Sequence, residues 1–317
     1  MRLVFFGTPS VAVPYLQRLA AEHEVLAVVT QPDRPRGRGR KLEEPPVKQE
    51  ALRLGLPVLQ PRRVRREQVC DLEPLRSAQA TVVVAYGQIL PADLCATEQR
   101  PALNVHYSLL PDLRGAAPVQ RALLGGRQTT GVTVQYVAEE LDSGDIILQQ
   151  EVSIEPEDDT GALFAKLNAV GVPLLSQALR LLERGEAPRA PQDGSRASYA
   201  PPLLPEEAQV RWERPAREIS HQIRAFSPQP GAFCHHLASG ARPSVRLKLY
   251  APVPAPGEEP GALPGQIVAV SAAGVLVQTG EGQVRIREVQ PAGRRRMSAA
   301  DYARGARLAA GARLEEG

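Results

Sequence analysis

Cysteine is scarce in this sequence, because the 317 residues include only Cys70, Cys95 and Cys234. The three are widely separated, no Cys-x-x-Cys pair occurs, and no histidine lies at ligand spacing from any of them. The sequence therefore argues against a disulfide framework and against a zinc module. Side chains of His235 and His236 would point to opposite faces of a strand, so we expect a surface pair and no metal site.

Long hydrophobic runs are absent as well. No stretch of about 18 apolar residues occurs, and Met1 leads directly into the strand-like segment LVFFG and not into a secretory signal peptide. Hydrophobic residues still make up 43% of the chain, which supplies a sizeable core and excludes a disordered protein. A chain of this length predicts two domains, and we expect a cytoplasmic protein without a membrane-spanning segment.

Lysine supplies only four of the 38 basic residues, and the net charge is only +3. Residues 205–317 hold 15 Lys and Arg against 11 Asp and Glu, so the positive excess lies in the C-terminal third. This distribution permits a polyanionic partner without requiring one.

The glycine patterns of common nucleotide-binding loops are also missing. FFGTPS contains only Gly7 where a dinucleotide fingerprint needs three glycines, and the chain has no P-loop and no Gly-x-Ser-x-Gly elbow. An NAD- or FAD-dependent enzyme is therefore disfavoured.

Strand-like and helix-like segments alternate through residues 1–188, among them a strand at 81–85, a helix over 115–124 and a helix over 161–183 that Thr160 could cap. This alternation predicts an α/β, Rossmann-like domain with a mostly parallel sheet. Residues 189–206 are rich in proline and alanine and are typical of a linker. Residues 207–317 contain short alternating strands between Gly- and Pro-rich turns, which predicts a small β-barrel or sandwich.

A dense polar segment, NVHYSLLPDLRG, follows a short strand. Asn104 and His106 are two residues apart, so in an extended chain they lie on the same face. The carboxyl ends of strands are where open α/β sheets bind ligands, and this location favours a catalytic pair. The alternative is a hydrogen-bonded structural histidine beside a turn asparagine.

Asp142 lies in LDSGD, a turn between two predicted strands. It could orient and charge-stabilise His106 as a loop carboxylate, or it could be an ordinary turn residue, and the spacing alone does not decide.

Five cations lie within the eight residues from Arg34 to Lys41, spaced by glycine and proline. Such a run is usually a solvated loop, but it also suits an arm that contacts phosphates.

Together these segments resemble the methionyl-tRNA formyltransferase branch of the folate-dependent formyltransferases. The matching stretches cover nearly the whole chain and include FFGTPSVAVPYL, TQPDRPRGRGRKL, VVVAYGQILP, NVHYSLLPDLRGAAPVQRALLGG, GVTVQYVAEELDSGDII and IRAFSPQPGAF. The Asn-x-His and Leu-Asp-x-Gly-Asp motifs are shared with glycinamide ribonucleotide and sugar-nucleotide enzymes. The arginine-rich loop and the basic C-terminal domain narrow the resemblance to the tRNA branch.

The resemblance implies formyl transfer from 10-formyltetrahydrofolate to methionyl initiator tRNA, with no metal, by a monomer whose C-terminal domain is an OB-like barrel. It implies a catalytic triplet of Asn104, His106 and Asp142. It also implies a segment that contacts the folate, formed by Ser108, Leu109, Leu110 and Pro111. A loop that contacts the tRNA is implied as well, with the cations Arg36, Arg38, Arg40 and Lys41.

Two features depart from the family pattern, one after the candidate histidine and one in the linker. Tyr107 follows the candidate histidine where a small residue is usual, and alternation predicts that it points away from the site. Pro202 and Pro205 occupy linker positions that commonly hold lysine, so any tRNA contact from those lysines is lost. A sugar-nucleotide or glycinamide ribonucleotide formyltransferase, or a non-catalytic RNA-binding protein, remains the alternative.

Overall fold

The structure is a computed structural model that describes residues 1–36, 41–64, 73–88, 90, 100–236 and 244–315. The chain divides into two compact units. The first comprises residues 1–118, 129–153 and 164–201, and the second comprises residues 119–128, 154–163 and 202–317. The domain boundaries expected at residues 188 and 206 remain a prediction.

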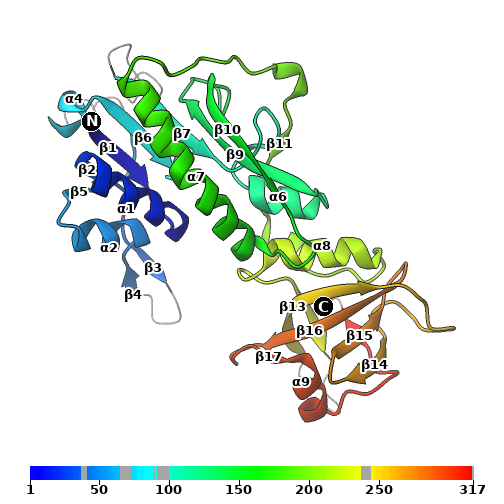
Figure 1. Cartoon of the computed structure of the whole chain (residues 1–317). Helices are drawn as coiled ribbons and strands as arrows, with labels where there is room; N and C mark the ends of the chain where they lie inside the picture. Colours follow the sequence, from blue (N-terminus) through cyan, green and yellow to red (C-terminus); the bar gives the residue numbers. More distant parts are fainter. Residues whose placement is uncertain (37–40, 65–72, 89, 91–99, 237–243, 316–317) are drawn as a thin grey trace. The chain divides into compact units, whose positions relative to one another are not determined.

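A seven-stranded sheet forms the centre of the first unit, in the order β10-β9-β7-β6-β1-β2-β5 (Figure 1). The strands from β7 to β5 pair in parallel, and β9 and β10 are antiparallel, which confirms the mostly parallel α/β sheet. The bounds are β1 Arg2–Gly7, β2 Glu24–Val29, β5 Val58–Leu59, β6 Ala80–Val84, β7 Ala102–His106, β9 Thr129–Tyr136 and β10 Ile146–Ser153.

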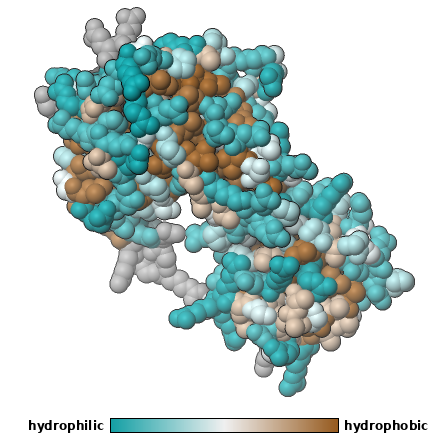
Figure 2. Space-filling view, viewed as in Figure 1, coloured by the Kyte–Doolittle hydropathy of each residue, from teal (hydrophilic) through white to brown (hydrophobic). Residues whose placement is uncertain are grey.

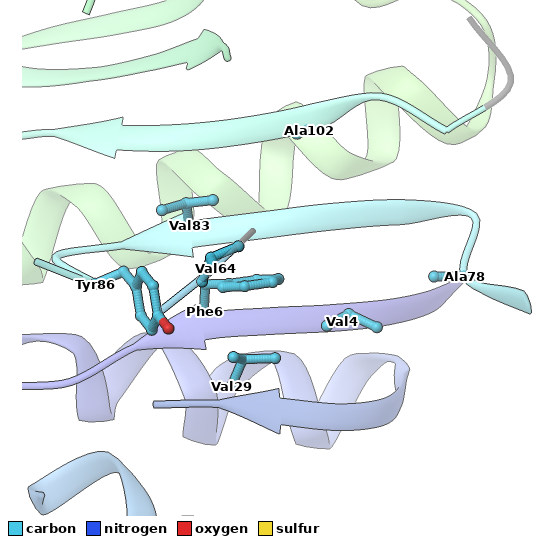
Figure 3. Close-up of a cluster of buried hydrophobic side chains, with 8 residues drawn as sticks. All are labelled: Val4, Phe6, Val29, Val64, Ala78, Val83, Tyr86 and Ala102. Atoms are coloured by element: carbon cyan, nitrogen blue, oxygen red, sulfur yellow. The ribbon is translucent and has the colours of Figure 1, made fainter. Parts of the chain in front are cut away.

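Central strands of this sheet are apolar on both faces, as expected for strands covered on both sides. All five residues of β6 are buried. On one side of the strands the side chains of Val4, Phe6, Val29 and Val83 form a cluster that Tyr86 joins, and helices lie on the other side (Figure 3).

Helices in the N-terminal part of the chain have proline in their first turn. Proline occupies the first turn of α1 (Val13–Glu22), which follows the 3-10 turn η1 (Ser10–Ala12), and of α2 (Pro46–Arg53). A short helix, α4, spans Glu73–Ser77. The helix expected from residue 115 begins later, as α6 (Pro118–Leu124), because Arg114–Gly115 forms strand β8 and Gly115 has a φ of 121°.

The longest helix is α7 (Thr160–Glu183), close to the predicted range. Its capping group is Asp159, whose Oδ1 accepts from the Ala162 N–H at 2.9 Å, so the expected role of Thr160 is wrong. The Thr160 hydroxyl instead donates to the Ala225 carbonyl at 2.7 Å.

Helix α7 is apolar and long enough to cross a membrane by length and composition, a test that core helices also pass. Leu167, Leu175 and Leu179 are at most 1% exposed, as in a core helix. Apolar residues on the visible face gather where α7 crosses the first unit (Figure 2).

Smaller elements complete the first unit. They are the hairpin of β3 (Arg34–Arg36) and β4 (Lys41–Glu43), the turn η2 (Gly194–Arg196), and β11 (Tyr199–Ala200), which pairs with β8. Both η2 and β11 lie in the segment that the sequence suggests is a linker.

The second unit is built on an antiparallel sheet in the order β14-β15-β16-β13-β12-β18, with β17 paired to β16. The ends of this sheet meet, because the Ile267 N–H donates to the Ala312 carbonyl and the Leu314 N–H to the Gly265 carbonyl. This closure confirms the expected OB-like barrel. The bounds are β12 Phe233–His236, β13 Val245–Ala255, β14 Ile267–Ser271, β15 Gly274–Gln278, β16 Gln283–Pro291, β17 Met297–Ser298 and β18 Leu314–Glu315.

In the described part of the second unit the barrel is accompanied by the helical segments η3 (Pro205–Ala208), α8 (Ala216–Phe226) and α9 (Ala299–Ala306), and most of α6 also belongs to this unit. The barrel interior holds Cys234, which is fully buried, so burial raises the pKa of its thiol. His236 is 5% exposed and its Nδ1 lies 3.1 Å from the Tyr302 hydroxyl, so the expectation of a surface histidine pair is wrong for this residue.

Gly171 of α7 permits a close approach to α1. A Cβ at this position would lie 2.1 Å from the hydroxyl oxygen of Tyr15, a fully buried residue, and 3.1 Å from Val132 Cγ1. Helix propensity alone predicts that Gly171→Ala stabilises by about 1 kcal/mol. We expect instead a loss of about 1–3 kcal/mol in the free energy of unfolding, measured by denaturant titration, because Tyr15 must shift.

Two further variants test this explanation. Gly305→Ala in α9, where no atom lies within 4 Å of the added carbon, should be neutral or stabilising. Tyr15→Phe removes the clashing oxygen and should reduce the penalty of Gly171→Ala. A stabilised Gly171→Ala protein would contradict the close approach.

Candidate functional site

Asn104 and His106 lie at the carboxyl end of β7 and on the same face, as predicted from their spacing. The antiparallel pairing with β9 places Asn104 opposite Gln135 and His106 opposite Thr133. His106 is 5% exposed. The two candidate side chains are therefore positioned by a regular ladder and not by a loop.

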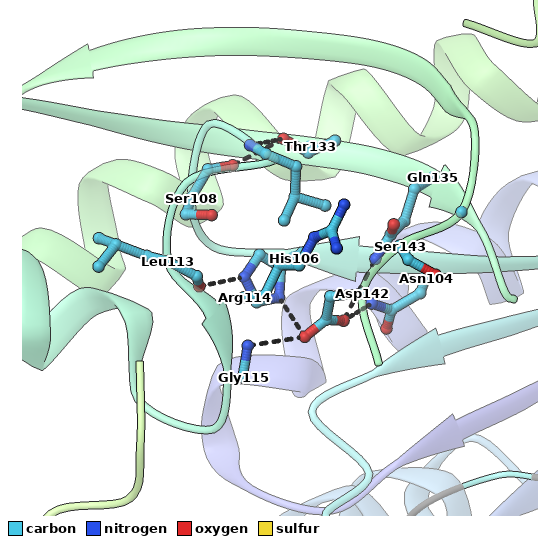
Figure 4. A network of polar contacts seen from close by, with 12 residues as sticks. Asn104, His106, Ser108, Leu113, Arg114, Gly115, Thr133, Gln135, Asp142 and Ser143 are labelled. Carbon is cyan, nitrogen blue, oxygen red and sulfur yellow. Dashed lines mark hydrogen bonds and ion pairs between the residues drawn. The ribbon is translucent and has the colours of Figure 1, made fainter. Parts of the chain in front are cut away.

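Asp142 reaches this pair from the turn that follows β9 (Figure 4). Its Oδ1 accepts from Asn104 Nδ2 at 3.3 Å and from Gln135 Nε2 at 3.2 Å. Its Oδ2 accepts from the Gly115 N–H at 2.9 Å and lies 3.5 Å from His106 Nδ1. The structure thus brings the three predicted residues into one hydrogen-bonded cluster.

Both ring nitrogens of His106 face acceptors. Nδ1 faces the Asp142 carboxylate, and Nε2 lies 2.9 Å from the Leu113 carbonyl. Leu113 adopts a left-handed backbone conformation with φ 58°. A neutral imidazole can donate to only one of these two acceptors, and an imidazolium can donate to both.

Asn104 offers a donor as well as a contact to Asp142. One hydrogen of its amide is directed to Asp142, and among the described residues no further partner takes the other. An N–H donor and an imidazolium held together can stabilise negative charge that develops on a substrate oxygen. The cluster is therefore suited to transfer of an acyl or formyl group.

A cavity of about 180 Å³ opens beside Asn104 and Asp142. Its apolar walls include Val83, Leu90 and Val137, and the last two also pack against the apolar cluster of the sheet. The lining also includes the polar side chains of Gln88, Gln135, Glu139 and Glu140. A cavity that combines apolar walls with polar groups is typical of a site for a small organic ligand.

The segment Ser108–Pro111 follows His106 directly and is held by the antiparallel strands. The Thr133 hydroxyl donates to the Ser108 carbonyl at 2.6 Å and accepts from the Leu110 N–H at 3.2 Å. Gln149 Nε2 donates to the Leu110 carbonyl at 3.0 Å. These contacts fix the backbone of the segment next to the cluster.

The arginine-rich loop is only partly described. Arg38 and Arg40 lie outside the described residues, and of Arg36 and Lys41 the structure describes the backbone, in β3 and β4. The start of this hairpin is anchored by Asp33. Its carboxylate accepts from Gln60 Nε2 at 2.7 Å and from Lys48 Nζ at 2.6 Å, and these two contacts hold the pKa of Asp33 below its usual value.

Tyr107 points away from the cluster, as alternation along the strand predicts. Its hydroxyl donates to Asn168 Oδ1 at 2.9 Å, and its ring packs edge-on against Phe164 at 5.3 Å between centroids. Burial raises the pKa of Tyr107. This side chain is part of the core and does not occupy the site.

Pro202 and Pro205, which occupy the two linker positions that commonly hold lysine, each take part in the local structure. The carbonyl of Pro202 accepts from Arg121 Nη2 at 2.8 Å, and Pro205 is the first residue of η3.

Four contributors to the cluster were not predicted from the sequence: Gln135, Gln192, the Leu113 carbonyl and the Gly115 N–H. Gln135 could have been found from the sequence, because it lies in a predicted strand that could pair with the strand holding Asn104, as it does in the structure. The backbone groups of Leu113 and Gly115 lie within the motif but depend on local conformation. Gln192 lies in residues 189–206, which the sequence predicts to be a linker, and no periodic pattern there indicates a functional residue.

Metal ligands are not gathered anywhere in the described part of the chain. No group of three or more His, Cys, Asp or Glu side chains that could hold a metal ion occurs among these residues.

Sequence comparisons match both units. A sequence model described as "Formyl transferase" matches residues 1–179, and one described as "Formyl transferase, C-terminal domain" matches residues 202–307. The methionyl-tRNA formyltransferase of Moorella thermoacetica is 47% identical over 308 residues, covering 96% of each chain. The methionyl-tRNA formyltransferase of Bacillus subtilis is 42% identical, covering 98% of this chain and 96% of its own.

Solved structures with the same fold are more distant. WlaRD, a sugar 3N-formyl transferase, superposes with a TM-score of 0.66 at 17% identity, covering 93% of this chain and 99% of its own. HypX from Aquifex aeolicus in complex with tetrahydrofolic acid has a TM-score of 0.64 at 18% identity, covering 97% of this chain and 48% of its own. At such identities the likeness establishes the fold alone.

Proposed function

The chain belongs to the formyl transferase family, and on that premise we propose that it transfers the formyl group of 10-formyltetrahydrofolate to the α-amine of methionyl initiator tRNA. The observation that carries the proposal is the cluster of Asn104, His106 and Asp142 in a chain whose two units both match the family. Relatives named for this activity align over nearly its full length. The reaction belongs to translation initiation, and we place it in the cytoplasm and assign it to a monomer.

The chemistry would use each member of the cluster differently. As the amine attacks the formyl carbon, negative charge develops on the formyl oxygen. Asn104 would donate its remaining amide hydrogen to that oxygen. His106 in its charged form would add a second donor by turning its Nε2–H from the Leu113 carbonyl to the substrate. Loss of one such donor typically costs about 10²–10³ in rate. Asp142 would keep the imidazolium oriented and neutralise its charge.

Proton balance assigns a second task to His106. The attacking amine must lose a proton, and N10 of the departing folate must gain one. In the proposed arrangement His106 would pass a proton from one nitrogen to the other, either directly or through a water molecule.

The cavity beside Asn104 is the place we assign to the ring system of the folate. Its apolar walls would bind the flat ring, and the polar end at Asn104 and Asp142 would meet the formyl group. Ser108, Leu109, Leu110 and Pro111, the segment that directly follows His106, would also contact the folate.

For the tRNA we propose the arginine-rich loop and the basic barrel. Arg38, with Arg36, Arg40 and Lys41, supplies closely spaced cations, and the C-terminal third carries the positive excess of the chain. Phosphate contacts of this kind give strong salt dependence.

A sugar-nucleotide N-formyltransferase is the alternative, because proteins of that name share the fold. A parallel assay separates the two activities. The purified protein is incubated with 10-formyltetrahydrofolate and, in separate tubes, methionyl initiator tRNA, glycinamide ribonucleotide and an amino-sugar nucleotide. Mass spectrometry detects the added formyl group. Formylation confined to methionyl-tRNA is expected, and formylation of a small amine alone would overturn the tRNA assignment.

Substitutions in the cluster test the catalytic roles. His106→Ala and Asp142→Asn should each lower kcat for methionyl-tRNA by at least about 10²-fold, because each removes charge stabilisation at the formyl oxygen. Asp145→Asn is the matched control, since this neighbouring carboxylate forms an ion pair with Arg189 at 3.6 Å and takes no part in the cluster. Near-normal kcat in a folded His106→Ala enzyme would refute the assignment.

Arg38→Ala tests the loop separately from the chemistry. We expect a higher KM for tRNA, an unchanged KM for the folate, and a salt dependence of tRNA affinity that is shallower by about one unit of slope. Arg184→Ala, which removes an arginine outside the loop, serves as the control. A change in folate KM with unaltered tRNA use would place Arg38 elsewhere.

A further inference from the structure

The segment from Ala190 to Ala200 runs along the catalytic cluster, although its composition is that of a linker. Backbone hydrogen bonds join Ala190 and Ile146 in both directions, at 2.8 and 3.1 Å. At its other end, β11 pairs in parallel with β8. Between these anchors the side chain of Gln192 turns toward the site.

The amide of Gln192 is bound on both sides. Its Nε2 lies within 3.0 Å of three acceptors, which are Gln135 Oε1 and the carbonyl oxygens of Asp142 and Gly144. Its Oε1 accepts from Arg114 Nη2 at 2.7 Å and from Nε at 3.1 Å. A guanidinium can only donate and a carbonyl can only accept, so this environment permits only one orientation of the amide.

Two of these contacts fix the backbone on either side of the Asp142 turn. Asp142 itself has a φ of 52°, a left-handed conformation that is uncommon for residues other than glycine. Gly144 is tightly enclosed, because a Cβ there would lie 1.8 Å from the Tyr136 carbonyl oxygen. Gln192 therefore supports a turn whose geometry sets the direction of the Asp142 carboxylate.

The same segment holds the opposite side of the cluster. The Arg114 N–H donates to the Ser198 carbonyl at 2.8 Å, and the Leu113 N–H donates to Ser198 Oγ at 2.9 Å. Leu113 supplies the carbonyl that faces His106 Nε2, and Gly115 supplies the N–H that binds Asp142 Oδ2. Both backbone partners of the His106–Asp142 pair thus lie on a loop that is fixed by residues 190–200.

We propose that Gln192 is a positioning residue for formyl transfer. It joins the Asp142 turn to the loop that carries Leu113, Arg114 and Gly115, and so it fixes the distance between the Asp142 carboxylate and His106. This inference rests on the function proposed above. Gln192 acts through Asp142, and among the described contacts it has none with Asn104 or His106.

Three variants distinguish this role from simple packing. Gln192→Ala removes both halves of the bridge. Gln192→Glu keeps the shape and the contact with Arg114, but it places carboxylate oxygens against the carbonyls of Asp142 and Gly144. Gln150→Ala, an exposed glutamine of β10, is the matched control.

Steady-state kinetics give the first readout. We expect kcat for methionyl-tRNA to fall about 10–100-fold in both Gln192 variants, with KM for tRNA unchanged, because the cluster is displaced while the tRNA surface is not. Recovery of kcat in Gln192→Glu would reduce Gln192 to a partner of Arg114 and overturn the proposal.

Hydrogen–deuterium exchange gives a second readout that needs no substrate and no activity. The Gly115 amide, bound to Asp142 Oδ2, and the Tyr136 amide, bound to the Asp145 carbonyl at 2.9 Å, should exchange faster in Gln192→Ala. Unchanged exchange at both amides together with unchanged kcat would refute the positioning role. If wild-type enzyme formylates nothing while exchange rises as expected, the proposed function fails but the bridge stands.

Discussion

The enclosure of the Asp142 carboxylate, whose side chain is only 10% exposed, is the constraint on which the site depends. A charged oxygen pair removed from water must be compensated by donors, and four converge here, from Asn104, Gln135, His106 and the Gly115 backbone. The donors come from three segments of the chain: Asn104 and His106 from β7, Gln135 from β9, and the Gly115 backbone from β8. The need to satisfy one carboxylate thus fixes the relative positions of every group that could act on a substrate.

The sheet supplies the rigid half of this arrangement. β7 is the last strand of the parallel part of the sheet, and β9 pairs with it in the antiparallel direction. This pairing places Gln135 opposite Asn104 without any loop. The left-handed residues Leu113 and Asp142 then turn two loops back over the strand end. Strained loop geometry persists where surrounding contacts over-determine it, and the segment around Gln192 and Ser198 supplies those contacts.

Sequence reasoning found the two strand residues of this site and the loop residue Asp142, but it missed Gln192 and the backbone groups of Leu113 and Gly115. Two-residue periodicity placed Asn104 and His106 on one face and Tyr107 on the other, because successive side chains of a strand point to opposite faces. Gln192 could not be found in this way, since its role arises from a contact 50 residues distant in sequence, with Asp142. The buried His236 was misjudged for a similar reason: its hydrogen bond to Tyr302 exists only in the closed barrel.

The choice of acceptor must be made outside the cluster. A sugar formyltransferase shares the fold at 17% identity, so the fold alone does not identify the acceptor. In the proposed mechanism Asn104, His106 and Asp142 act on the formyl group and the amine proton, and neither depends on what the amine is attached to. Discrimination therefore requires surfaces that meet the rest of the acceptor. For the proposed tRNA substrate we assign this task to the arginine-rich loop and the basic barrel, whose cations would bind phosphates away from Asp142.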